Sequence, residues 1–83
     1  MDKQSKLYHA VNDLIAEVVK TLREKHKLKI VGSFSDRFAP VTITISFASD
    51  QKAERLIYNV DEILKGVNPK SVVGILEEKF NLL

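Results

Sequence analysis

Apolar residues recur every three or four positions over the first part of the chain, from Lys3 to about His26. This spacing places them on one face of an α-helix. No Gly or Pro interrupts the segment, so we expect one helix of about 24 residues, spanning roughly 36 Å. The residues of the apolar stripe are Leu7, Val11, Leu14, Ile15, Val18, Val19 and Leu22.

The hydrophobic period then changes to two, which is the spacing of a β-strand. A first strand is predicted to begin near Leu28 and to reach Phe34. A second strand has the clearer alternation, and the connection before it is too short for a crossover helix, so the two should pair antiparallel as a hairpin. The second strand has an apolar face of Val41, Ile43, Ile45 and Phe47 and a polar face of Thr42, Thr44, Ser46 and Ala48.

Two further helices are predicted in the second half of the chain. Ser49-Asp50 is typical of a helix N-cap, and apolar residues at helical spacing predict a helix over Gln51–Lys65. Gly66 should end this helix, and Pro69 suits the first position of the next one. Inside that last helix, Gly74 is either required by the close approach of a neighbouring backbone or simply tolerated, at a cost of up to ~1 kcal/mol relative to Ala.

The predicted order is helix, strand, strand, helix, helix, which makes residues 1–83 a single α+β domain with an antiparallel β-hairpin packed on helices. A two-stranded hairpin is marginal in water. From Phe38 to Ser49 there is no charged side chain to protect the second strand from unwanted pairing. We therefore expect this strand to be paired or covered. The partner is a second copy, giving a four-stranded sheet across a dimer, or a strand of another protein; alternatively, the termini or a helix shield the strand within a monomer.

Self-association is predicted through the second strand or through the last helix. The polar face of the second strand contributes Thr42, Thr44 and Ser46. The apolar residues that the last helix has in surplus contribute Ile75 and Leu82, although the ordinary apolar fraction of a protein surface explains these two equally well.

The composition excludes several kinds of chemistry. The chain has no Cys, which removes disulfides, thiolate nucleophiles and sulfur-ligated metals, and a reducing cytoplasm fits this best. No signal peptide or membrane span is expected. The serines stand in no nucleophile-elbow context, and the 3 glycines form no phosphate-binding loop. We therefore expect neither an enzyme nor a cofactor or small-molecule substrate.

Three residues at helical spacing suggest a metal site only at first sight. His9, Asp13 and Glu17 share one face of the first helix, but ligands from a single solvated helix do not close a metal site, so we expect surface decoration. His26 ends the same helix, where the dipole favours a protonated ring, and a stabilising role is predicted for it. The adjacent acids Glu77-Glu78 project in different directions and do not resemble an acid/base dyad.

One segment concentrates positive charge. Over Lys20–Lys29, five cationic residues and one acidic residue, Glu24, give a local charge of +4, whereas the whole chain has +2. Such a surface is a candidate for nucleic-acid phosphates, while the competing explanation is that cations gather at a helix C-terminus because the dipole favours them. The five are Lys20, Arg23, Lys25, Lys27 and Lys29.

The residues carry no family motif that we recognise. The pattern favours a small non-enzymatic protein-interaction or regulatory module, either a homodimer or a binder of another protein. Nucleic-acid binding by the basic segment is the alternative.

Overall fold

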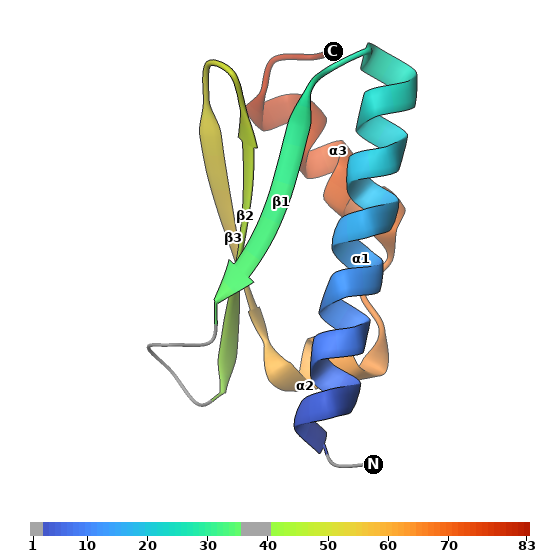
Figure 1. Cartoon of the computed structure of the whole chain (residues 1–83), viewed down its shortest axis with the longest axis vertical. Helices are drawn as coiled ribbons and strands as arrows, with labels where there is room; N and C mark the ends of the chain where they lie inside the picture. The colour runs from blue at the N-terminus through green and yellow to red at the C-terminus, as the bar shows by residue number, and fades with distance from the viewer. Residues whose placement is uncertain (1–2, 36–40) are drawn as a thin grey trace.

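The computed structural model describes residues 3–35 and 41–83 (Figure 1). Within them, three helices and a three-stranded antiparallel sheet form an α+β fold, the class that the sequence predicts. The strand order is β1-β2-β3, and the connection between β1 and β2, residues 36–40, lies outside the described residues. The elements are α1 (Lys3–His26), β1 (Ile30–Ser35), β2 (Thr42–Ser49), β3 (Ala53–Asn59), α2 (Val60–Lys65) and α3 (Pro69–Lys79).

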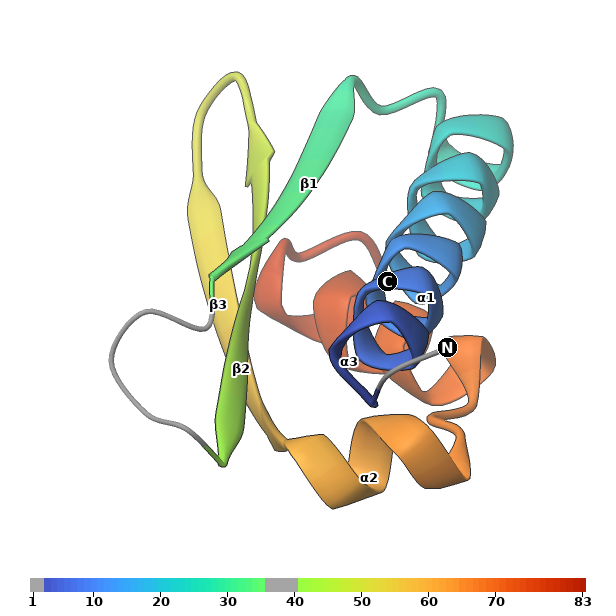
Figure 2. The same ribbon diagram turned by 60° about the horizontal axis from the view of Figure 1, so that its bottom comes forward.

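The helices lie together on one face of the sheet, and the core fills the layer between them (Figure 2). The predicted apolar stripe of α1 points into this layer, as do Ile43, Ile45 and Phe47 of the predicted apolar face of the second strand. The fourth residue predicted for that face, Val41, lies before β2 and is 62% exposed. Residues from α1, β2 and α3 that are fully shielded from solvent include Val11, Val18, Leu22, Ile43, Ile45, Phe47, Val72 and Leu76. Among the described residues, none of the helices combines the length and the apolar composition that crossing a bilayer requires.

The segment after β2 is a strand, so the predicted helix over Gln51–Lys65 is wrong in its first part. The backbone N–H of Ser49 donates to the carbonyl of Lys52 at 2.8 Å, which closes a tight turn. The chain then returns along β2 as β3, and only its last portion, Val60–Lys65, is helical. The apolar residues around Leu56 fit both the helical spacing and the two-residue spacing of a strand. Pairing with β2 makes this segment a strand, because strand preference depends on packing context.

β2 is the central strand of the sheet, so neither of its edges is left unpaired. Of the three alternatives for that strand, cover within the same chain agrees with the structure, although a third strand provides it rather than the termini or a helix. Ser46, for example, pairs with Ser33 of β1 on one side and with Arg55 of β3 on the other. A central strand needs no charges for protection, which accounts for its uncharged sequence. The hairpin is extended by β3 of the same chain, and self-association itself stays a prediction.

Two glycines have opposite surroundings. A Cβ atom on Gly32 would lie 2.5 Å from Cγ2 of Ile15 and 3.2 Å from Cε1 of Phe47, so the bare backbone lets α1 approach β1. A Cβ atom on Gly74 would meet nothing within 4 Å. Of the two explanations for Gly74, the structure supports simple tolerance.

Two helices end in a left-handed residue that is not glycine. Lys27 has φ 55° directly after α1, and Asn81 has φ 56° after α3. At the end of α3, the N–H of Leu82 donates to the carbonyl of Glu77, and the N–H of Asn81 donates to that of Glu78. These two bonds form a Schellman motif, in which Asn is one of the tolerated residues.

Candidate interaction surface

The helices leave the opposite face of the sheet uncovered (Figure 2). The side chains at the alternate strand positions that form this open face are mostly short and uncharged. Among its described positions, Arg55 is the one charged residue. Two apolar residues are well exposed there, Val31 at 60% and Ile57 at 69%, but they stand at different ends of the sheet. The predicted residues Thr42, Thr44 and Ser46 lie in the middle of this face and are half-buried. This face alone is therefore not an apolar docking patch.

The outer edge of β3 is the more distinctive feature. The turn bond between Ser49 and Lys52 fixes which residues of β3 direct their backbone groups toward β2, because bonded and non-bonded pairs alternate along an antiparallel ladder. Even-numbered residues of β3 point to β2. Odd-numbered residues direct their N–H and C=O groups away from the sheet, and their side chains are exposed: Ala53, Arg55, Ile57 and Asn59. The N–H of Asn59 is already engaged, because it donates to Oε1 of Glu62 at 2.9 Å.

The outer edge of β1 is occupied at one position. Arg23 of α1 donates from Nε at 3.1 Å and from Nη2 at 2.9 Å to the backbone carbonyl of Ile30. α1 also packs alongside β1 (Figure 1). A strand that paired along the whole of β1 would have to displace the guanidinium at Ile30, so β3 offers the more accessible edge.

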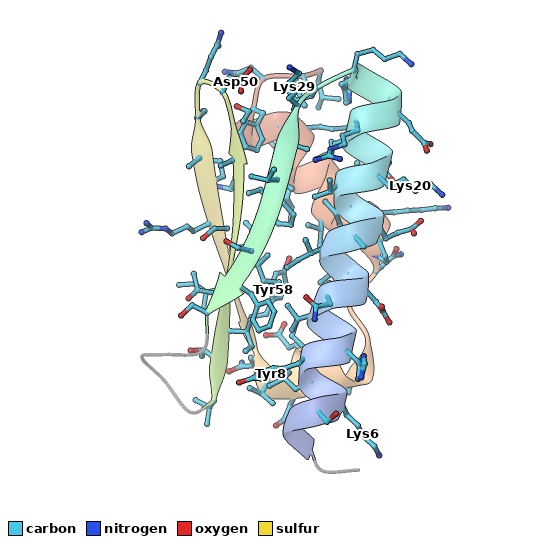
Figure 3. All side chains as sticks on the ribbon, viewed as in Figure 1. Lys6, Tyr8, Lys20, Lys29, Asp50 and Tyr58 are labelled. Carbon is cyan, nitrogen blue, oxygen red and sulfur yellow. The ribbon has the colours of Figure 1, made fainter. Side chains whose placement is uncertain are left out.

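The structure divides the basic segment. Arg23 is held by the Ile30 carbonyl, and Lys25 places Nζ 2.7 Å from Oε2 of Glu77. Lys20, on the side of α1, and Lys29, at the end of the molecule, are exposed and point in different directions (Figure 3). Lys27 is exposed as well. Two of the five cations therefore serve the fold, and the others do not form one compact group.

A groove of about 600 Å³ is lined in part by Lys29 and Asp50. Both residues lie at the same end of the molecule (Figure 3). The walls of the groove come from Lys27–Lys29, Ser49–Lys52 and Phe80–Leu82. Lys52 is already engaged, with Nζ 2.6 Å from the carbonyl of Lys79 and 3.4 Å from Oε1 of Glu54. α1 and α3 both end at this groove, and the negative ends of their dipoles offset the lysines. The groove is therefore a poor site for an anion.

The predicted helix-three residues differ in exposure. Ile75 is 39% exposed on α3. Leu82 is half-buried and packs against the core, so it is not surplus apolar surface. Ile75 thus remains the candidate on this side of the molecule.

Glu77 is the one buried charged residue among those described, and its partners come from α1. Its Oε2 lies 2.7 Å from Nζ of Lys25 and 2.7 Å from Nε2 of His26. Hydrogen bonds from Lys25 and then from His26 lower the pKa of the Glu77 carboxyl. The expectation for His26 was a contact with the helix dipole only; because 51 residues separate it from Glu77, no local pattern could have shown this pair.

The aromatic rings and the acidic residues of α1 do not form a site. Tyr8 packs against Phe34 on the helix side of the sheet, with 5.5 Å between the ring centroids and the rings tilted by 55°. The described part of the open face carries no aromatic residue. His9, Asp13 and Glu17 are exposed. Within the described ranges, no three His, Asp or Glu side chains lie close enough together to hold a metal ion.

Comparison with known proteins gives no match to any family model, curated protein or solved structure. Function is therefore inferred from the surface of the molecule itself.

Proposed function

We propose that this chain is a small non-enzymatic protein-interaction module that binds an extended protein segment along the outer edge of β3. The observation that carries the proposal is the accessible ladder of outward backbone groups from Ala53 to Ile57, beyond which the N–H of Asn59 is held by Glu62. Ile57, at the end of this ladder, is 69% exposed. An edge of this kind accepts another strand through main-chain hydrogen bonds, and neighbouring side chains set the preference for the segment.

The edge carries little of the protection that exposed strands usually have. Lysines, prolines and inward charges commonly keep such strands from pairing. In β3, Glu54 is turned to the helix side of the sheet and neutralised by Lys52 at 3.4 Å. Arg55 is the remaining charged residue of β3. Each backbone hydrogen bond that an added strand forms with this edge contributes about 1 kcal/mol net.

The nucleic-acid alternative has less support. Lys20, Lys27 and Lys29 remain for phosphates once Arg23 and Lys25 are engaged. Readers of single strands also rely on exposed aromatic rings for stacking, which the described open face does not provide. Nucleic-acid binding, like the expected lack of enzyme activity and the cytoplasmic location, stays a prediction.

A display selection tests the proposed function. Random extended peptides of about ten residues, the upper length of common strands, are selected against the immobilised full chain at low concentration. Recovered peptides should slow hydrogen exchange at the outward amides of Arg55 and Ile57 by at least about tenfold, because both become hydrogen-bonded.

The Ile57→Pro variant supplies the decisive comparison. Proline removes the outward N–H of residue 57 and leaves the bonds between β3 and β2 in place, so the selected peptides should lose binding. An Ile75→Ala variant on α3 should retain it. Peptides that bind Ile57→Pro as tightly as the original chain would refute the proposal.

A further inference from the structure

We infer that the segment bound at this edge is β3 of a second copy, so that two three-stranded sheets join into one antiparallel sheet of six strands. This inference rests on the proposed function and names its partner. An antiparallel edge is self-complementary, because a two-fold axis brings each outward N–H of one strand opposite an outward C=O of the same strand in the other copy.

Charge selects among the registers that this symmetry allows. If the axis passed beside Arg55, the two guanidinium groups would stand directly opposite each other, and like charges in that position are destabilising. Shifting the axis toward the turn brings the two Glu54 carboxylates opposite each other or moves the pairing off the strand. Shifting it by one or two residues the other way removes the clash. The pairing is therefore centred on Leu56 or on Ile57.

Both remaining registers bury apolar surface that the single chain leaves partly exposed. With the axis at Leu56, Arg55 of each copy lies opposite Ile57 of the other, and the two half-buried Leu56 side chains meet. With the axis at Ile57, the two exposed Ile57 side chains meet, and Leu56 lies opposite the partner's Tyr58. Apolar and aromatic cross-strand pairs of this kind are stabilising.

The interface is short, which determines how the dimer should behave. Edge pairing of a single strand of 7 residues buries less than the ~1,200 Å² of a standard stable complex. We therefore expect exchange between monomer and dimer at about micromolar to millimolar concentration.

Solution mass by light scattering tests the association. The mass of the original chain should rise from 9.4 kDa toward twice that value as concentration increases. Ile57→Lys places a cation opposite the identical cation of the partner when the axis lies at residue 57, or opposite the partner's Arg55 when it lies at residue 56. Like charges in these positions are destabilising, so the mass should stay at that of the monomer. The matched control is Ile75→Lys, the same substitution at the other exposed isoleucine, and its mass should follow the original chain.

Single-cysteine variants test the register. Because the chain has no Cys, one introduced thiol forms a disulfide only with its counterpart in a second copy. Directly opposed residues in an antiparallel pair lie about 4.5 to 5.5 Å apart between Cα atoms, within disulfide range. Mild oxidation should therefore link either Leu56→Cys or Ile57→Cys rapidly, and Ile75→Cys at a slower, collisional rate.

The outcomes separate the two proposals. A concentration-dependent mass that Ile57→Lys abolishes, with crosslinking at residue 56 or 57, supports pairing of two β3 strands. A chain that stays monomeric, or one whose association depends on Ile75 instead, overturns the inference. If such a chain still binds selected peptides along β3, the proposed function holds with another protein as the partner.

Discussion

Nε2 of His26, the last residue of α1, lies 2.7 Å from Oε2 of Glu77 in α3. Lys25 approaches the same oxygen at 2.7 Å, so one carboxylate holds two consecutive residues at the end of the long helix. Glu77 is buried, with 6% of its surface exposed, and removing its partners would leave a charge poorly solvated. This cluster fixes α1 to α3 and is a structural feature rather than a reactive one.

The free energy of unfolding should therefore fall in acid, because the Glu77 carboxylate becomes protonated. Its pKa is lower in the folded chain than the usual 4.5, so the stabilisation is fully present above about pH 4.5 and is lost as the pH falls through the folded pKa. Glu77→Gln should lower the melting temperature at pH 7, and the difference from the original chain should shrink toward pH 3. Thermal unfolding followed by circular dichroism measures this, with Glu78→Gln as the exposed neighbouring control. An equal difference at both pH values would contradict the assignment.

Gly32→Ala should destabilise the fold. The new methyl group would overlap Cγ2 of Ile15 at 2.5 Å and press on the ring of Phe47, and overpacking of this kind costs about 1–3 kcal/mol. Urea unfolding gives the change in the free energy of unfolding. An unchanged value would mean that α1 can shift away from β1 at no cost.

Gly74→Ala should have the opposite sign. The added methyl group meets nothing within 4 Å, and Ala in place of Gly inside a helix gains up to ~1 kcal/mol. The same urea experiment applies, and the two variants control for each other because the chemical change is identical. A loss of stability here would indicate that α3 needs the glycine for a contact with a partner.

Lys27→Gly should raise the free energy of unfolding by up to about 1 kcal/mol, because Lys27 sits at φ 55°, where a side chain is strained. Lys29→Gly removes the same charge two residues further along, at a residue without positive φ, and should give no gain. Thermal melts of the two variants at equal salt compare them directly. Equal melting temperatures would show that charge, not backbone strain, governs this turn.

The sequence predicted the helices that begin and end the chain and the faces of β2, because a strong period over a long segment leaves one structural solution. α1 was predicted with its observed bounds. β3 was not predicted because Ser49 was interpreted as a helix N-cap. In the structure, its Oγ accepts from the N–H of Lys52 at 3.2 Å. The same bond from serine to the third residue onward is what an N-cap makes, so the local signal was present but belongs to a hairpin turn here.

The position of each strand in the sheet could not be predicted in the same way. An uncharged strand fits both a central place and an unprotected edge, and only the existence of β3 distinguishes them. The accessible edge of the sheet therefore belongs to β3 and not to β2. The contact between His26 and Glu77 depends on how α1 and α3 pack, which no spacing along the chain encodes.

The hydrogen bonds from Arg23 to the Ile30 carbonyl bear on how far copies of this chain would assemble if they pair through β3 as inferred. A sheet with two free edges can recruit further copies without end and grow into a filament. The inferred pairing would use the accessible edge of both copies, and the guanidinium would stand in the way of a strand added to β1 at Ile30. The inferred assembly would therefore be a finite pair of molecules rather than a fibre.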